Sequence, residues 1–478
     1  MTASLHDSVV ELARRAAEGS PEGASILARL TEPLAVALAG RVNAGKSTLL
    51  NALIGERLAL TDATECTRVV ARYSHGQRYS ATAPGPGGQF RPLTFERGPD
   101  GLRVAIADGE PGVSSIRVTA PNAALRVMTL IDTPGVGSDD SARMAATTSA
   151  LGINHDRRSD ADAVVYLLRH AHRTDLDTLE ALRDRWAGNG SAFNVVAVLS
   201  RADEIGSGRL DAMESAAEIA ARYESDGRLR GLATRVVPVS GLLAETGATL
   251  REEEFAWLRT FAAGSSAEVD RLLLATGLLL GQSSSPLTVE VRRLLLQRFG
   301  LFGVRLAVAA LRDGTVSDAP GLARLLVETS GLSGLRDALS EQFGQRARVL
   351  QALTAMGSLR RLATSQPTES AWVRGLERVE AASHEVAEIR ALQSATDGLL
   401  DLAPAQQQRL TLLLAATDVP ARLGIPGTAS RPELRDSAIQ AISDWRTLAA
   451  DPIFNQPTLD ACETAARAAE RIFADLAE

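Results

Sequence analysis

Apolar and polar residues alternate along the chain with two different periods, and the change between them divides the sequence. From Leu34 to Gly241, short runs of β-branched and aliphatic residues are separated by segments with helical spacing. The runs lie at residues 34–40, 125–132, 163–169, 193–200 and 236–241. Apolar runs that alternate with helices are typical of a mostly parallel sheet covered by helices. We therefore predict an α/β head over residues 34–247.

Helical spacing also occurs on both sides of this head. Apolar positions at residues 4–30 form one stripe and predict helices over residues 1–33 that pack with a stalk. After about residue 246 the strand pattern stops, and prolines divide the remainder into helical segments. Apolar residues from Leu332 to Met356 predict one long helix. The sequence thus predicts an all-α helical bundle, a stalk, over residues 248–478.

Composition disfavours some classes of function and indicates the cell compartment. The net charge of -7 and pI near 5.6 disfavour a protein that coats nucleic acid, so no nucleic-acid partner is expected. Two cysteines and no secretory signal favour the cytoplasm. The apolar runs at 272–281 and 301–311 are short, and Arg305 interrupts the second, so we expect no membrane-spanning helix. Residues 301–311 are either a lipid-contacting tip or, as we favour, a core helix.

The stretch GRVNAGKS, residues 40–47, contains Lys46, the only lysine in a chain whose other basic residues are arginine. A phosphate-binding loop needs a compact ammonium on a flexible stem, because a planar guanidinium is too wide to fit between phosphate oxygens. Gly40 and Gly45 let the backbone N–H groups point inward, and the helix that begins near Ser47 directs its positive dipole end at the phosphates. We predict a nucleoside triphosphate site with Lys46 on the phosphates.

Magnesium ligands are predicted from the end of the phosphate loop and from two segments that follow it. The hydroxyl of Ser47 would ligate Mg²⁺, and Asp132, which ends an apolar strand in IDTPG, would hold it through water. Gly135 would direct its N–H at the γ-phosphate as part of a second switch. In the first switch, residues 58–73, we favour Thr67 as the threonine that closes over Mg²⁺, with Thr61 and Thr64 as alternatives.

The base is predicted from SRAD, residues 200–203, at the end of a further apolar run. A carboxylate at Asp203 accepts hydrogen bonds from guanine N1 and N2, which adenine cannot supply, so GTP is favoured over ATP. The stem of Arg201 would stack on the base, as a lysine does in most GTPases. The predicted nucleotide-contacting set is Gly40, Asn43, Ala44, Gly45, Lys46, Ser47, Thr48, Arg201, Asp203, Ser240 and Gly241.

Taken alone, GRVNAGKSTLLNAL resembles the Era and TrmE GTPases, which act on RNA. The long interval before Asp132, the segment SSIRVTAPNAALRVMTLIDTPG at 114–135 and the helical C-terminal part instead resemble the dynamin superfamily. Within it, TDATECTRVV, SRADEIGSGR, VPVSGLL and LQRFGLFGVRLAVAAL look like the isoniazid-inducible IniC family of mycobacteria. The expected fold is a P-loop GTPase head on a helical stalk.

This resemblance implies a Mg²⁺-dependent GTPase in which head dimerisation is coupled to membrane remodelling or envelope maintenance under cell-wall-targeting drugs. It places Lys46 and Ser47 on phosphate and Mg²⁺, Thr67 in the first switch, Asp132 and Gly135 in the second, and Asp203 on guanine. The implied partners are an anionic lipid surface and either a second copy or a larger, IniA-like dynamin. The implied location is cytoplasmic, peripheral at the inner face of the plasma membrane.

Two residues depart from the dynamin pattern: Val42 and Asn43 stand where dynamins carry Gln and Ser. Intrinsic hydrolysis is therefore expected to be slow or assisted by a partner. This keeps two alternatives open, a slow GTP-dependent switch that docks on another dynamin-like protein and, less favoured, an RNA-associated GTPase. Five arginines are candidates for lipid headgroups or for an ordinary solvated face: Arg292, Arg293, Arg298, Arg360 and Arg361.

Overall fold

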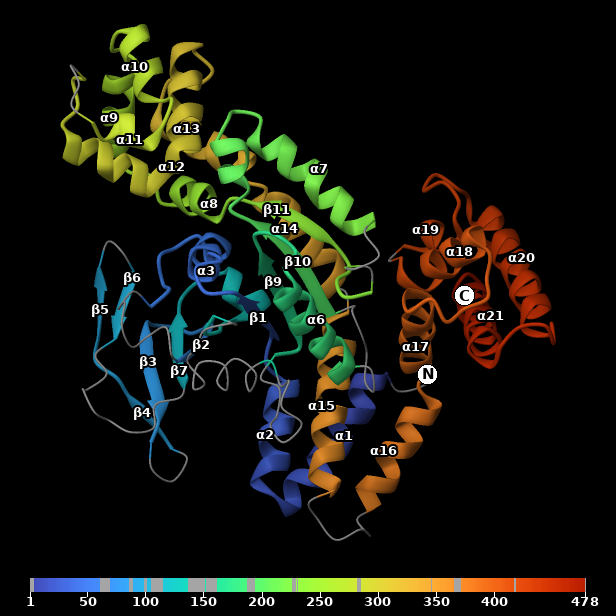
Figure 1. Cartoon of the computed structure of the whole chain (residues 1–478). Coiled ribbons are helices and arrows are strands. Elements are labelled where there is room, and N and C mark those ends of the chain that lie inside the picture. The colour runs from blue at the N-terminus through green and yellow to red at the C-terminus, as the bar shows by residue number, and fades with distance from the viewer. Residues whose placement is uncertain are drawn as a thin grey trace.

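A computed structural model gives the fold of the chain (Figure 1). It describes residues 4–60, 69–85, 89–98, 101–104, 115–135, 151, 161–186, 194–225, 229, 231–281, 285–344, 346–364, 371–416 and 418–477. A mixed sheet with flanking helices forms the head, and the described chain after it is helical. The predicted fold class, an α/β head with a helical C-terminal part, is confirmed.

The sheet has nine strands in the order β11-β10-β9-β1-β8-β2-β7-β3-β4. Its parallel part consists of β1 (Leu34–Gly40), β8 (Met128–Asp132), β9 (Ala163–Leu168), β10 (Val195–Ser200) and β11 (Val236–Val239). β2 (Val70–His75) pairs antiparallel with β8 and continues the sheet through β7 (Ser115–Ala120), β3 (Ser80–Pro84) and β4 (Phe90–Pro92). A separate hairpin joins β5 (Phe95–Gly98) and β6 (Gly101–Val104).

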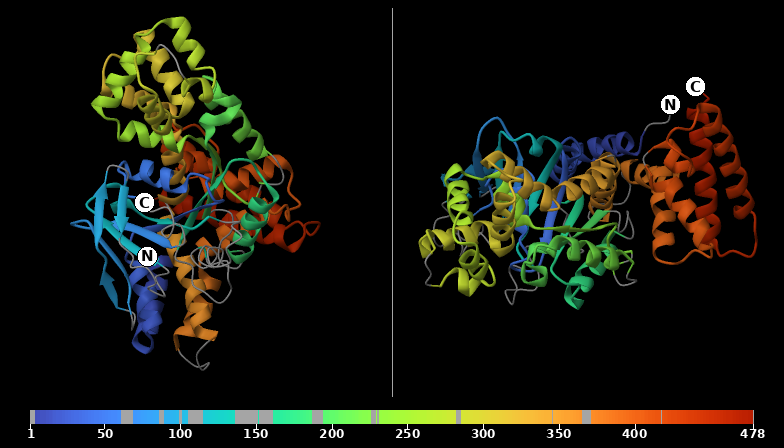
Figure 2. Two further views of the ribbon diagram at one scale, coloured as in Figure 1. Left: turned by 60° about the vertical axis from the view of Figure 1, so that its left-hand side comes forward. Right: turned by 90° about the horizontal axis from the view of Figure 1, so that it is seen from above.

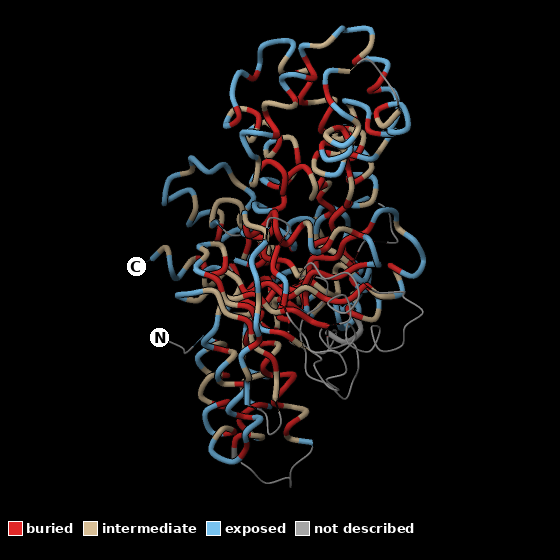
Figure 3. Tube along the Cα trace, turned by 90° about the vertical axis from the view of Figure 1, so that its left-hand side faces the viewer, coloured by how far each residue is buried: buried red, intermediate tan, exposed pale blue. Residues whose placement is uncertain are grey.

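The central strands are buried on both faces, which explains why they appear in the sequence as continuous apolar runs. In β1, Val36 and Leu38 point into one core while Ala35 and Ala37 point into the other. Helices that cover the sheet include α3 (Lys46–Ile54), α4 (Ala124–Val127), α6 (Arg173–Trp186), α7 (Ala212–Ser225) and α8 (Gly241–Ala248). Figure 3 shows this buried centre as a band of red within the head.

Below the sheet in Figure 1, two N-terminal helices and two helices that follow the head form a neck. They are α1 (Leu5–Gly19), α2 (Pro21–Leu30), α15 (Ala347–Thr364) and α16 (Ala371–Ala382). Leu12 of α1 and Met356 of α15 belong to their shared apolar core. At the start of β9, Asp162 accepts a hydrogen bond from the Ala35 N–H at 2.9 Å and pairs with Arg29 of α2 at 3.2 Å. The neck is thereby attached to the amino ends of the strands.

A helical module, residues 252–329, lies at the opposite end of the head, at the top of Figure 1. It contains α9 (Glu252–Ala262), α10 (Ser266–Leu272), α11 (Thr276–Leu279), α12 (Val289–Arg312) and α13 (Ala319–Thr329). Among the described residues, α12 is the one helix long and apolar enough to cross a bilayer by length and composition. Its Phe302 and Val304 are buried in the module core. Residues 301–311 are thus a core segment, as favoured.

The single long helix predicted from Leu332 to Met356 was wrong. Two helices, α14 (Leu332–Leu339) and α15, are separated by a short π-helix at Ser340–Gly344. The apolar stripe is continuous because both helices bury one face, but they bury it in different cores. Leu332 joins the core of the head, whereas Met356 joins that of the neck.

The last helices form a bundle set to one side of the head (Figure 2). They are α17 (His384–Thr396), α18 (Pro404–Ala415), α19 (Val419–Leu423), α20 (Arg431–Ala449) and α21 (Gln456–Asp475). Cys462 is buried in their core, and burial raises its thiol pKa to about 11. The domain boundaries predicted after residues 33 and 247 stay predictions.

Candidate functional site

The phosphate loop connects β1 to α3 at the carboxyl end of the sheet, as the sequence predicts. Gly40 has φ 140°, and a Cβ there would lie 2.3 Å from the backbone oxygen of Leu167. Gly45 has φ 92° and stands directly before the first turn of α3. Only glycine adopts these conformations without strain. Gly40 in addition lets the loop lie close against β9, whereas the space around Gly45 is open.

Lys46 is buried inside this loop. Its Nζ donates to the carbonyl oxygens of Gly40 at 3.1 Å and Arg41 at 3.0 Å, which fixes the ammonium over the loop. Burial lowers the pKa of Lys46, while the nearby Asp132 carboxylate acts in the opposite direction. The side chain is positioned to bring a positive charge to a bound phosphate.

Ser47 and Asp132 meet beside the lysine. The Ser47 hydroxyl donates to Asp132 Oδ2 at 2.7 Å, bringing the start of α3 to the end of β8. Asp132 Oδ1 is buried and has no hydrogen-bond partner among the described residues. Burial raises the pKa of Asp132, opposed by the Ser47 hydrogen bond and by Lys46. A hydroxyl beside a carboxylate oxygen that lacks a partner fits Mg²⁺ with its waters.

The second-switch glycine packs directly on the phosphate loop. A Cβ on Gly135 would lie 2.6 Å from the Val42 backbone nitrogen, so a larger residue would force the two segments apart. Val42 is 44% exposed and, with Asn43 at φ 62°, lines the phosphate cavity of about 280 Å³. Thr67, Thr64 and Thr61 lie outside the described residues, so the first-switch prediction stays a prediction.

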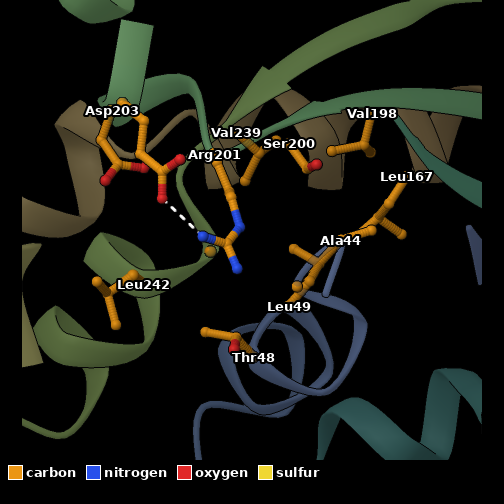
Figure 4. A pocket seen from close by; sticks show the side chains of 13 residues that line it. Ala44, Thr48, Leu49, Leu167, Val198, Ser200, Arg201, Asp203, Val239 and Leu242 are labelled. Carbon is orange, nitrogen blue, oxygen red and sulfur yellow. Dashed lines mark hydrogen bonds and ion pairs between the residues drawn. The ribbon is translucent and has the colours of Figure 1, made fainter. Parts of the chain in front are cut away.

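A second cavity, of about 140 Å³, adjoins the first and receives the predicted base-reading residues (Figure 4). Arg201 has φ 54°, reaches into the middle of this cavity and pairs with Glu204 at 2.7 Å. Asp203 is buried at its rim, and burial raises its pKa while a hydrogen bond from Ser240 opposes that rise. Gly241 lines the same cavity.

The two cavities share Gly45, Thr48 and Arg201, so they form one continuous groove from phosphate to base. Ala44 lines its base end. Of the predicted nucleotide-contacting residues, all but Gly40 and Ser240 line this groove. Gly40 lies behind it, where its carbonyl accepts from Lys46, and Ser240 is buried and hydrogen-bonds Asp203. The roles of all these residues stay predictions. Sequence reasoning missed Glu204, which holds Arg201, and Gly300, which lies behind Asp203. The glycine pair in the apolar run RFGLFG was the available signal for the second.

Comparison with known proteins identifies the family. Residues 35–197 match the protein family described as "50S ribosome-binding GTPase". Over 458 residues, 94% of this chain and 91% of the relative, the sequence is 39% identical to "Isoniazid-induced protein IniC" of Mycobacterium tuberculosis, in strains CDC 1551 and H37Rv. The chain belongs to the IniC family. With its phosphate loop and GTPase domain, this IniC-family chain is a GTPase, a GTP-hydrolysing enzyme, as predicted.

Solved structures with similar chains have low identity and low TM-scores. An oligomerised bacterial dynamin pair matches 99% of this chain and 75% of its own, at 13% identity and TM-score 0.30. The cytosolic domain of the T. maritima FeoB iron transporter matches 65% of this chain and 97% of its own, at 15% identity and TM-score 0.21. The bacterial selenocysteine-specific elongation factor matches 45% of this chain and 27% of its own, at 16% identity and TM-score 0.23.

Proposed function

We propose that this IniC-family GTPase couples GTP hydrolysis and dimerisation of its heads to membrane remodelling or envelope maintenance. It would act from the cytoplasm, peripherally at the inner face of the plasma membrane, on anionic lipid. The name of its mycobacterial relatives, "Isoniazid-induced protein", supports a role in the response to drugs that target the cell wall.

The chemistry that this site supports is in-line attack of water on the γ-phosphate. Lys46 would donate to the phosphate oxygens, and inward-facing N–H groups of the loop would stabilise the developing charge. Ser47 and Asp132 would hold Mg²⁺, which supplies further neutralisation of the phosphate charge when bound. Asp203 would fix the guanine and thereby the position of the reacting phosphate.

Val42 supports assistance by a partner head. The polar side chains that line the phosphate cavity in the described part of the chain are Asn43, Lys46, Ser47, Thr48, Asp132, Thr133 and Arg201. Thr133 donates its hydroxyl to the Leu38 carbonyl, and the others are proposed to contact phosphate, metal or base. Val42 has no group that could orient the attacking water. A second head, from another copy or from a larger IniA-like dynamin, would order the switches and complete the site.

The observation that carries the mechanical part of the proposal is the neck. Its helices precede and follow the head in the sequence and attach at the amino ends of the strands, opposite the nucleotide groove. A rearrangement at the groove could be transmitted along β1 and β9 to the neck, and from α15 to the terminal bundle.

The arginines considered for lipid contact are mostly engaged elsewhere. Arg292 is buried and donates to the carbonyls of Leu279 and Gly281, at 2.6 Å and 3.0 Å. Arg298 pairs with Glu254 and Arg360 pairs with Glu380, and Arg361 donates to the Ser358 hydroxyl at 3.1 Å. We therefore do not base the lipid proposal on an arginine face, and it rests on the resemblance to the dynamin superfamily alone.

Steady-state GTP hydrolysis tests the proposal, measured with no addition, with anionic liposomes and with bulk RNA, using Lys46→Ala as the blank. Stimulation by liposomes alone is the expected result. A slow rate unchanged in all three would favour the alternative that Val42 supports, a GTP-dependent switch that docks on another dynamin-like chain. Stimulation by RNA alone would contradict both and revive an RNA-associated role.

A further inference from the structure

Helix α12 breaks its helical conformation at Gly300, directly behind the base-reading loop. Gly300 has φ 64° and ψ 174°, in the middle of a helix that runs from Val289 to Arg312. This conformation is essentially restricted to glycine. A Cβ on Gly300 would lie 3.5 Å from Asp203 Oδ2 and 3.5 Å from Leu242 Cδ2. The break therefore brings bare backbone against the carboxylate that is proposed to read guanine.

The residues before the break are held by contacts outside α12. In an unbroken helix, the carbonyl of Arg298 would accept from the N–H four residues later. Here the buried Thr246, from α8, donates its hydroxyl to that carbonyl. The guanidinium of Arg298 pairs with the Glu254 carboxylate of α9 at 2.6 Å, and both side chains are largely buried. The break is thus supported from two neighbouring helices.

The residues after the break hold the other side of the base-reading loop. A Cβ on Gly208 would lie 3.4 Å from both the Asp203 carbonyl oxygen and the Phe302 backbone nitrogen. Arg305 Nη1 donates to the Ser207 carbonyl at 2.9 Å and also to that of Gly208. Ser207 has φ 62°, an unfavourable conformation for a residue with a side chain, so α12 stabilises the loop at its strained residue.

We propose that Gly300 is a positioning residue for base selection: the break in α12, supported by Thr246 and Arg305, sets the place of the Asp203 carboxylate and thereby the preference for guanine. The inference rests on the proposed role of Asp203 as the guanine reader. It makes the helical module, residues 252–329, part of the nucleotide site, and it explains why a core helix carries a strained glycine at its centre.

The test compares Gly300→Ala with Gly314→Ala. Gly314 also has positive φ, 78°, and a Cβ there has no heavy atom within 4 Å, so it is the control for a methyl group added to a positive-φ glycine away from the base-reading loop. Kd values are measured for GDP, for IDP, which lacks the 2-amino group, and for ADP, by competition with a fluorescent GDP. In Gly300→Ala we expect GDP to bind about tenfold more weakly and IDP to change less, so that the GDP/IDP selectivity collapses. Gly314→Ala should keep the wild-type selectivity.

A second variant keeps the proposal testable if Gly300→Ala does not fold. Thr246→Val adds no bulk and removes the donor to the Arg298 carbonyl, so the GDP/IDP selectivity should fall about threefold, in the same direction. Unchanged selectivity in folded Gly300→Ala, or in Thr246→Val if the first variant does not fold, would overturn the positioning role.

Asp203→Asn separates this inference from the assignment on which it rests. An asparagine amide can donate to the 2-oxo group of xanthine, so the variant should prefer XDP to GDP. A variant that still prefers GDP would remove Asp203 as the reader and the inference with it. A switch to XDP, together with unchanged selectivity in Gly300→Ala and Thr246→Val, would remove only the positioning role.

Discussion

At the scale of single residues, the nucleotide site depends on atoms that few side chains can supply. Lys46 places a compact ammonium against the carbonyls of Gly40 and Arg41, inside a loop with little room around it. Asp132 keeps one buried oxygen without a partner beside the Ser47 hydroxyl. These two features explain why a chain rich in arginine carries its single lysine at position 46.

Replacing Lys46 by arginine should be as damaging as replacing it by alanine. The guanidinium keeps the charge but cannot fit inside the loop, so we expect fluorescent GTP to bind at least 100-fold more weakly in both variants, with the melting temperature preserved. Binding is measured by fluorescence titration. Near-normal affinity in Lys46→Arg would show that charge alone is sufficient.

The phosphate loop could be predicted from sequence because its residue types and spacing are dictated by the ligand. The role of Gly300 could not be predicted, although the glycine pair in RFGLFG marks the position, because that role depends on α12 meeting a loop almost 100 residues earlier in the chain. The pairing of Arg201 with Glu204 was missed for a similar reason, since spacing does not reveal which way an exposed arginine turns.

At the scale of elements, buried ion pairs and close glycines decide how the helices join. α9 and α12 are connected through Glu254 and Arg298, and α1 meets α2 where Gly23 lies against the backbone of Ala16. The prediction of one long helix across α14 and α15 was wrong, because a continuous apolar stripe does not reveal that its two halves enter different cores.

Glu254→Gln should destabilise the helical module. Removing one charge leaves Arg298 buried without its carboxylate, which costs about 3 kcal/mol in comparable pairs. The neighbouring Glu253 is exposed, so Glu253→Gln serves as the control. Urea unfolding, with proteolytic cleavage within residues 252–329 as the readout, measures the difference in unfolding free energy between the two variants. Equal stability of the two variants would contradict a structural role for the pair.

Gly23→Ala should destabilise the neck. A Cβ at position 23 would lie 2.3 Å from the backbone of Ala16, so α1 and α2 would have to separate, at a cost of about 1–3 kcal/mol. Gly19 has open space around its Cβ position, and Gly19→Ala should be neutral or slightly stabilising. Thermal unfolding of both variants checks this, and a neutral Gly23→Ala would mean that the neck packs more loosely.

At the scale of the whole molecule, the groove and the neck occupy opposite ends of the strands, and the terminal bundle follows the neck. Arg346, at the start of α15, donates to the Ala415 carbonyl at the end of α18 at 2.6 Å. It lies close to a cavity of about 450 Å³ that is lined by residues of both the head and the bundle. This contact helps to set the position of the bundle relative to the head.

Arg346→Met should make the position of the terminal bundle relative to the head less fixed. Losing the donor to Ala415 should increase the radius of gyration in small-angle X-ray scattering without unfolding either part. Arg348, two residues further along and exposed on α15, provides the control Arg348→Met. Identical scattering from both variants would show that the bundle is held by other contacts.

The central claim is that the groove at the carboxyl end of the sheet hydrolyses GTP with Mg²⁺ and selects guanine. Phosphate release from GTP and from ATP, with Mg²⁺ and with EDTA, tests it most directly, with Lys46→Arg as the blank. We predict turnover of GTP alone, only with Mg²⁺, and none in the variant. Equal turnover of ATP, or a rate that survives in EDTA or in Lys46→Arg, would contradict the account.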